Sequence, residues 1–357
     1  MPIFASSSFR YNAFMNKNKV RFGLIIAVII AVVALSLIAY VFWAPNIFTK
    51  TKDNEYFLLI PDDTTYDELV AELTDNTRVK RINTFKQVSR ALKFKTVKSG
   101  RYRIVNGMNN LTLVKMLRNG KQTPVQLKFN NIRTKEQLAA RLSKQLMPDS
   151  LQILNLLNDS AFLSQYGVTQ ETAVSLFLPN TYEMFWNVKA EKIFDRMYKE
   201  YNKFWTEERK QKAAAIPLTQ VEVSTLASIV DAETNSKAEK PIVAGLYINR
   251  LKRNIPLQAD PTVIFAIGDF SIKRVLNVHT RFNSPYNTYR NVGLPPGPIR
   301  IPTLAGLDAV LNYDKNDYIF MCAKETLNGE HNFAATWSEH QKNASKYQKA
   351  LNERGIR

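Results

Sequence analysis

The sequence predicts an α+β protein with a single N-terminal transmembrane helix followed by two further α+β regions. Three observations support this class: an uncharged aliphatic run near the N-terminus, short alternating strands that each precede a helix, and a second half dominated by helical periodicity. With 357 residues, of which 45% are hydrophobic, the chain is long enough to bury more than one core.

The aliphatic run occupies residues 23–43 and lies within a stretch, residues 22–49, that carries no charge. At about 1.5 Å per residue this run spans the roughly 30 Å hydrocarbon core of a bilayer. Basic residues without acids precede it, so the positive-inside rule places residues 1–21 in the cytoplasm, residues 22–44 in the membrane and the rest outside. A cleaved signal peptide is the alternative, but the run is long for one and lacks a clear A-x-A site.

The net charge of +18 is concentrated in one part of the chain. Residues 76–147 contain 18 Lys and Arg and one acid, Glu136. Because the predicted topology puts this stretch outside the cytoplasm, nucleic acid is not expected as a partner, and anionic headgroups or an acidic wall polymer fit better. A solvated basic face without a specific ligand is the other interpretation.

Several enzyme classes are excluded by what the sequence lacks. A single cysteine, Cys322, forms no internal disulfide and no four-cysteine zinc site. The three histidines are not spaced as HExxH, and the dinucleotide fingerprint, the P-loop and the GxSxG elbow are absent. These absences argue against a zincin, a dinucleotide-binding enzyme, a P-loop NTPase and a common α/β-hydrolase.

Two strand–helix units repeat within the basic region. Residues 56–60 predict a strand and residues 66–73 a helix, with Thr65 and Glu68 forming a T-x-x-E capping box. Residues 125–129 predict a second strand, followed by a helix after Thr134. We place the boundary of this region near residue 148, which gives predicted domains of residues 50–148 and 149–357.

One helix of the second half carries a candidate catalytic carboxylate. Thr219 and Glu222 form a capping box, and the apolar stripe that follows leads at helical spacing to Glu233. Burial and the negative helix end would both raise the pKa of Glu233, as a general acid requires. Asp231 points about 200° away around the helix, so the two do not form a carboxylate pair. A glutamate paired with a buried Arg or Lys is the structural alternative.

At these residues the sequence resembles the YceG-like (MltG) family of endolytic murein transglycosylases. The matching stretches are LASIVDAET (226–234), AGLYINRL (244–251), PLQADPTVI (256–264), PYNTYRNVGLPPGPI (285–299) and HNF with SEH (331–340). The resemblance implies a LysM-like wall-binding subdomain at residues 50–148 and a catalytic domain at residues 149–357. Asp231, Ala259 and Ala334 depart from the residues that the family often has.

The resemblance also implies roles for particular residues. Glu233 is expected to be the catalytic acid, and the expected substrate contacts are Gln258, Asp260, Asn287 and Tyr289. Each of the polar loop residues taken alone could instead make an ordinary loop hydrogen bond. The implied location is the bacterial cytoplasmic membrane, and the implied partners are peptidoglycan strands, the membrane and peptidoglycan synthases.

One carboxyl group suffices for the implied reaction, and the resemblance implies no metal and no cofactor. Glu233 would protonate the glycosidic oxygen between N-acetylmuramic acid and N-acetylglucosamine, and would then accept the proton of the muramic 6-hydroxyl as it attacks C1, leaving a 1,6-anhydro end. Two alternatives stay open: a non-catalytic wall-binding scaffold for synthesis enzymes, and a conventional hydrolase that uses a second carboxylate such as Asp260.

Overall fold

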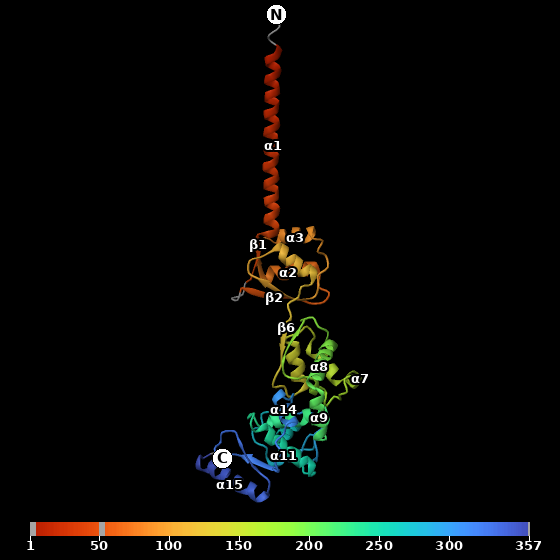
Figure 1. Ribbon diagram of the computed structural model, residues 1–357, viewed down its shortest axis with the longest axis vertical. Helices are drawn as coiled ribbons and strands as arrows, with labels where there is room; N and C mark the ends of the chain where they lie inside the picture. Colours follow the sequence, from red (N-terminus) through yellow and green to blue (C-terminus); the bar gives the residue numbers. More distant parts are fainter. Residues whose placement is uncertain (1–4, 50–53, 356–357) are drawn as a thin grey trace. The chain divides into compact units, whose positions relative to one another are not determined.

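The computed structural model describes residues 5–49 and 54–355. Contacts between residues divide the chain into two compact units, the first made of Met1–Pro124 with Phe185–Asn187 and the second of Val125–Met184 with Val188–Arg357. Both units combine helices with small antiparallel sheets (Figure 1), so the predicted α+β class is confirmed.

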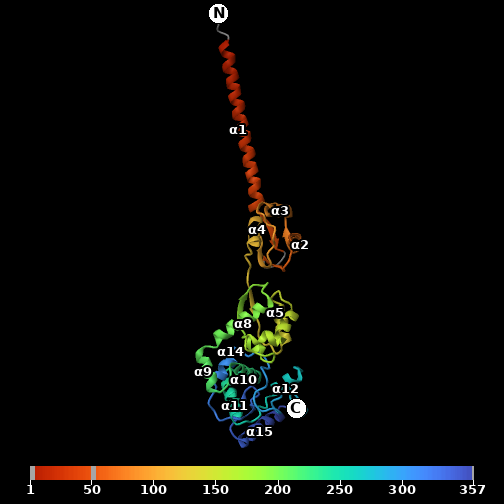
Figure 2. The same cartoon turned by 90° about the vertical axis from the view of Figure 1, so that its right-hand side faces the viewer.

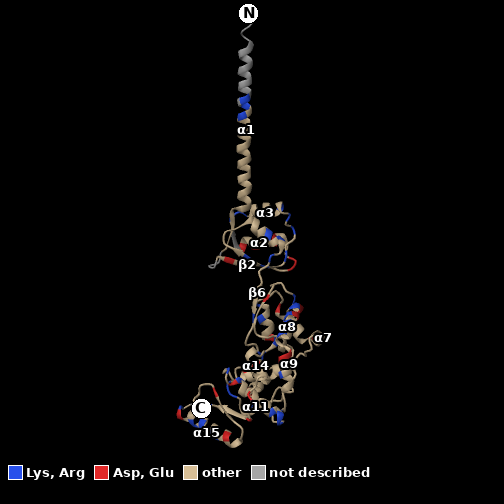
Figure 3. Cartoon of the chain, in the orientation of Figure 1, with Lys and Arg blue, Asp and Glu red and all other residues tan. Residues whose placement is uncertain are grey.

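The first unit begins with one long helix, α1 (Ala5–Trp43). Its part from Lys19 to Trp43 is long and apolar enough to cross a membrane. In Figure 3 the ribbon of α1 is coloured for Lys and Arg over a short part and then carries no charged residue. The side chains of this uncharged length are largely exposed, as lipid-facing residues would be. The predicted N-terminal apolar helix is thus confirmed.

After α1 the first unit consists of short strands and short helices. Its elements are β1 (Pro45–Thr49), β2 (Glu55–Ile60), α2 (Tyr66–Asn76), β3 (Thr77–Val79), α3 (Ile82–Ala91), β4 (Gly100–Val105), β5 (Met108–Asn109) and α4 (Asn110–Asn119). The strands form two antiparallel sheets, ordered β3-β1-β5 and β2-β4. A LysM-like arrangement of this unit stays a prediction.

The predicted capping box of α2 forms as its spacing requires. The Thr65 amide donates to the Glu68 carboxylate at 2.8 Å, and the Glu68 amide donates to the Thr65 hydroxyl at 3.3 Å. Leu69 and Leu73, one turn apart, then lie in the core of the unit.

The second unit holds the remaining elements. They are β6 (Val125–Lys128), α5 (Lys135–Ser143), α6 (Ser150–Asn158), α7 (Ser160–Ser164), η1 (Ala173–Leu176), β7 (Thr181–Met184), α8 (Ala190–Phe204), α9 (Glu207–Ala215), α10 (Gln220–Glu233), α11 (Lys240–Lys252), α12 (Asp260–Ile267), α13 (Asn277–Thr280), α14 (Leu304–Leu311), β8 (Phe320–Ala323), β9 (His331–Ala334) and α15 (Trp337–Glu353). β6 pairs with β7, and β8 pairs with β9, both antiparallel.

The structural division falls at Pro124, about one strand–helix unit before the predicted domain boundary at residue 148. The second predicted strand, β6, pairs with β7 at Leu127 opposite Tyr182, and Leu138 and Leu142 of α5 are buried in the core of the second unit. The two copies of the strand–helix repeat therefore lie in different units. As a result the basic stretch is divided, with 13 of its 18 cationic residues before residue 125 and five after it.

Helix α10 lies at the centre of the second unit, against α11 and α14 (Figure 2). The sequence predicted one buried stripe, but every residue from Val223 to Asp231 is buried. The polar residues on the expected solvent face bond back to the helix instead: the hydroxyls of Thr225 and Ser228 donate to the Val221 and Thr225 carbonyls at 3.0 and 2.7 Å. Full burial fixes the end of α10, and with it Glu233.

Candidate active site

Glu233 is the last residue of α10, and it lines a polar pocket of about 240 Å³. The pocket is bounded by α10, α11, the start of α12, the loop at Tyr289 and the β8–β9 pair. Its lining residues are Glu233, Leu246, Tyr247, Arg250, Leu257, Gln258, Asp260, Tyr289, Met321, Cys322, Ala323 and His331. Titratable groups from five separate segments therefore converge on one small space.

The environment of Glu233 makes both the protonated and the ionised form of its carboxyl group accessible near neutral pH. Burial raises the pKa of Glu233 to about 7, and the negative charge of Asp260 adds to this rise. A 2.7 Å hydrogen bond from the Tyr247 hydroxyl to Oε1 of Glu233 acts in the opposite direction, because it stabilises the ionised form. A carboxyl group with this balance suits general acid–base chemistry.

Asp260 is the second carboxylate of the pocket. It is the first residue of α12, where the partial positive charge of a helix N-terminus favours an anion. The Tyr289 hydroxyl donates to Oδ1 of Asp260 at 2.6 Å. Burial and this bond both raise the pKa of Tyr289, so its phenol remains a hydrogen-bond donor at neutral pH. Asp260 and Tyr289 thus form one polar wall of the pocket.

Gln258 lies on the same wall and has a backbone φ of +50°, a conformation uncommon for a residue with a side chain. Its amide donates to the Thr288 carbonyl at 3.1 Å, and its side-chain oxygen accepts from Nη1 of Arg250 at 3.2 Å. These bonds join the 256–260 segment to the 287–289 loop and to α11, and they hold Gln258 at the pocket.

The structure places Asn287 differently from the other three predicted contact residues. Its side chain is fully buried, at 0% exposure, and does not line the pocket. Nδ2 donates to the carbonyls of Thr280 and Phe282, and Oδ1 accepts from the amide of Tyr289 at 3.0 Å. Asn287 therefore shapes the loop that presents Tyr289, whereas Gln258, Asp260 and Tyr289 line the pocket themselves.

Arg250 and Tyr247 are site residues that the sequence reasoning did not assign. They lie one turn apart on α11, and each faces the pocket. Arg250 donates to the carbonyls of Ile319, Pro256 and Leu257 at 2.6–3.0 Å, so it ties β8 to the segment that carries Gln258. The helical spacing of AGLYINRL could have placed both residues on one face, but not against Glu233.

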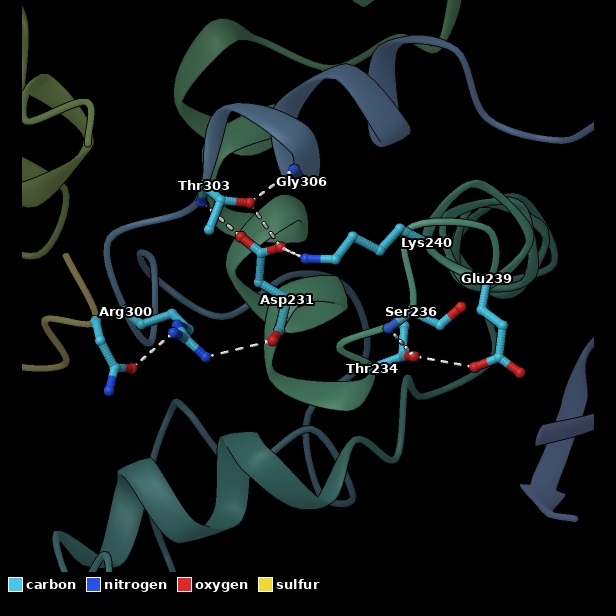
Figure 4. Close-up of polar contacts among 9 residues, drawn as sticks. Asp231, Thr234, Ser236, Glu239, Lys240, Arg300, Thr303 and Gly306 are labelled. Atoms are coloured by element: carbon cyan, nitrogen blue, oxygen red, sulfur yellow. Dashed lines mark hydrogen bonds and ion pairs between the residues drawn. The ribbon is translucent and has the colours of Figure 1, made fainter. Parts of the chain in front are cut away.

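Asp231 has a structural role, as its predicted angle from Glu233 implies. Its buried carboxylate pairs with Lys240 and accepts from the Thr303 amide and hydroxyl, which fixes the start of α14 (Figure 4). Gly306 packs so closely here that a Cβ would lie 2.5 Å from Oδ2 of Asp231. The alternative for Glu233 was a pair with a buried Arg or Lys. In the structure it is Asp231, two residues earlier, that pairs with a buried lysine.

Glu239 orders the segment between α10 and α11. Its carboxylate accepts from the Thr234 hydroxyl at 2.9 Å (Figure 4) and from the His331 amide at 2.7 Å. The ring of His331 lies 3.2 Å from the same carboxylate and lines the pocket. His331 is thereby held on the β9 side of the site.

Comparison with known proteins bears on this geometry. Residues 58–346, about four fifths of the chain, match the YceG-like family, and this range includes every residue of the pocket. The chain belongs to the YceG-like family. The motifs that suggested this family in the sequence are the ones that build the pocket, since they supply Glu233, Tyr247, Gln258, Asp260 and Tyr289.

Characterised relatives of this YceG-like chain share most of its length. It is 28% identical over 311 residues to the endolytic murein transglycosylase of Bacillus subtilis, covering 83% of this chain and 85% of the relative. It is 25% identical over 323 residues to the endolytic murein transglycosylase of Streptococcus pneumoniae serotype 2, covering 81% of this chain and 57% of the relative. The chain thus spans little more than half of the pneumococcal protein.

A crystal structure of a YceG-like protein from Listeria monocytogenes resembles this fold. The two share 25% sequence identity and a TM-score of 0.56, and the match covers 82% of this chain and 99% of the other. The YceG-like fold therefore extends over nearly all of the chain that follows α1.

Proposed function

We propose that this protein is a membrane-anchored endolytic lytic transglycosylase that cleaves peptidoglycan strands. The observation that carries the proposal is Glu233, whose pKa is raised to about 7 within a polar pocket of about 240 Å³. Relatives that match this chain over more than four fifths of its length are named endolytic murein transglycosylases.

In the proposed reaction Glu233 acts twice. The protonated carboxyl group donates to the glycosidic oxygen between N-acetylmuramic acid and N-acetylglucosamine as an oxocarbenium-like state develops. The resulting carboxylate, stabilised by the Tyr247 hydroxyl, then accepts the proton of the muramic 6-hydroxyl, which attacks C1 and closes the 1,6-anhydro ring. Because the nucleophile belongs to the substrate, this reaction needs no activated water.

The remaining polar residues would hold the sugars in place. Gln258, Asp260 and Tyr289 line the pocket with hydrogen-bond acceptors and donors, which suit the hydroxyl and acetamido groups of the glycan. Asn287 would serve indirectly by holding the loop of Tyr289.

Conventional hydrolysis is the second candidate function, and one observation favours it: Asp260 shares the pocket with Glu233. In that case Asp260 would activate a water, and the product would carry a reducing end. The names of the relatives favour transglycosylation. A non-catalytic scaffold is the third candidate, but it does not require a carboxyl group with a raised pKa in an open pocket.

The topology and domain roles belong to the same proposal. Residues 22–44 would cross the cytoplasmic membrane with residues 1–21 inside, since Lys17, Lys19 and Arg21 precede the apolar length of α1. Residues 50–148 would bind the wall through a LysM-like fold, residues 149–357 would carry the catalysis, and peptidoglycan synthases would be the protein partners.

A product analysis tests these candidates. The full-length protein in detergent is incubated with peptidoglycan strands, and the products are identified by mass spectrometry. Anhydro-muramic ends support transglycosylation, reducing ends support hydrolysis, and intact strands with retained binding support the scaffold. Only the first outcome agrees with the proposed function.

A further inference from the structure

A second pocket of about 150 Å³ lies beside the active pocket, within the same unit. Its lining residues are Arg133, Ala232, Pro261, Ile264, Phe265, Phe270, Ile272, Ile299 and Arg300. Seven of these nine residues are apolar, and both of the charged groups are guanidinium groups. The proposed acid–base reaction of Glu233 uses none of these side chains.

The two pockets flank the same pair of helix ends. Ala232 precedes Glu233 at the end of α10, and Pro261 follows Asp260 at the start of α12. Neighbouring residues in a chain have Cα atoms about 3.8 Å apart, so each helix end presents one side chain to each pocket. The two pockets are therefore one residue apart along the chain at both helix ends.

Arg300 lies at this pocket with part of its hydrogen-bonding capacity unused. Nη2 donates to Oδ1 of Asn131 at 2.8 Å, and Nη1 donates to the Asp231 backbone carbonyl at 3.3 Å (Figure 4). Its Nε is buried and has no hydrogen-bond partner within residues 5–49 and 54–355. A buried N–H of a cation without an acceptor is costly, and a bound anion would satisfy it.

The charge of Arg300 has no carboxylate of its own. Burial lowers the pKa of Arg300; Asp231 opposes this change, and the nearby charge of Arg133 adds to it. The Asp231 carboxylate is already occupied by Lys240 and Thr303. Arg133 and Arg300 form no ion pair with a carboxylate in the part of the chain that the structure describes, so the pocket holds two guanidinium groups without a salt-bridge partner there.

Arg133 supplies the second guanidinium group of the pocket. It is exposed, and its guanidinium lies 4.9 Å from the centre of the Phe270 ring, in cation–π contact. Two guanidinium groups with flat donor faces suit carboxylates better than single point charges would. The side chains of Ile264, Phe265 and Ile272 form an apolar surface that suits short aliphatic side chains of a ligand.

We propose that this second pocket binds a carboxylate-bearing peptide branch of the glycan strand, and that Arg133 and Arg300 recognise the carboxylate. The inference rests on the proposed function, because the muramic residues of peptidoglycan carry such peptides next to the bond that Glu233 would cut. The pocket then makes the enzyme select strands whose peptides are still attached.

The decisive experiment compares two substrates: glycan strands with their peptides, and the same strands after an amidase has removed the peptides. The full-length Arg133→Ala protein should lose about tenfold in kcat/KM on the peptide-bearing strands, the value of one charge-assisted contact, and nothing on the stripped strands. Arg133→Lys should recover part of the loss. Arg141→Ala, which removes an exposed charge from α5 without touching the pocket, should behave as wild type.

An equal loss of kcat/KM on both substrates, or no loss on either, would overturn the proposal that this pocket binds the peptide. If the wild-type protein cuts neither substrate, the proposed function fails, and the pocket is then tested by binding alone. Calorimetry of full-length wild type and Arg133→Ala would use a soluble disaccharide peptide, the peptide-free disaccharide and inorganic pyrophosphate. Binding of the disaccharide peptide that weakens about tenfold in Arg133→Ala supports the pocket; preference for pyrophosphate would assign it to a lipid-linked phosphate and refute the peptide.

Discussion

The hydroxyl of Tyr247 donates a 2.7 Å hydrogen bond to Oε1 of Glu233, joining the middle of α11 to the last residue of α10. The bond stabilises the ionised carboxylate, whereas burial of the same carboxyl group favours the protonated form. The raised pKa of Glu233 is the balance of these two effects, and several expected outcomes depend on it.

Glu233→Gln should reduce strand cleavage at least about a thousandfold, because an amide neither donates the acid proton nor accepts one from the 6-hydroxyl. The glutamine keeps the shape of the side chain, so circular dichroism and strand binding should stay those of wild type. Turnover is measured from the rate of anhydro-muramic ends. Normal turnover by the glutamine variant would remove Glu233 from the mechanism.

Glu233→Gln should also stabilise the protein at alkaline pH. A carboxyl group whose pKa rises from 4.5 to about 7 on folding is penalised when it ionises, so its cost appears as pH rises through this window. The shift corresponds to at most about 3 kcal/mol. Urea denaturation should therefore show a stability gain for the variant at pH 8 that vanishes at pH 4, and an equal gain at both would contradict the assignment.

Tyr247→Phe should move the alkaline limb of the pH–rate profile to higher pH. Removing the hydroxyl removes the bond that lowers the pKa of Glu233, so the acid form persists further into the alkaline range. The variant should also be slower, since the carboxylate formed after proton donation loses its donor. An alkaline limb unchanged from that of wild type would show that Tyr247 does not tune Glu233.

Asp260→Asn should shift the same limb to lower pH, because the negative charge of Asp260 raises the pKa of Glu233. Its products decide between the two catalytic candidates. Under transglycosylation the variant still forms anhydro-muramic ends, though more slowly, whereas under hydrolysis it forms almost no product. Mass spectrometry of the variant's products separates the two results.

Lys240→Met should destabilise the fold by about 3–5 kcal/mol, because it leaves the buried Asp231 carboxylate without its cation. The double variant Asp231→Asn, Lys240→Met should recover part of this loss, since no unpaired charge remains. Denaturant titration gives both values. A single variant as stable as wild type would show that Lys240 does not hold the end of α10.

Much of the local structure was predictable because its causes lie within a few residues. The capping boxes at Thr65 and Thr219 formed as their spacing requires, and the aliphatic run of residues 23–43 lies in one helix that is long enough to span a bilayer. Glu233 was likewise predictable, because α10 begins at a recognisable cap and its apolar spacing carries the glutamate to the far end.

Other features depended on contacts between distant segments. The division at Pro124 follows from the pairing of β6 with β7 across more than fifty residues, a partner that the repeat itself did not indicate. Asn287 and Tyr289 looked equivalent in the sequence, yet one is buried beneath the loop and the other lines the pocket.

The sequence by itself therefore determined the apolar N-terminal helix, the α+β class, the family and the position of Glu233 at the end of a buried helix, since each depends on local periodicity or on a continuous motif. Only the tertiary structure decided that Tyr247, Asp260 and Glu233 share one pocket, and that Arg133 and Arg300 face a second one beside it. The physical reason is that a pKa and a binding site arise from burial and from charges that meet only when distant segments pack together.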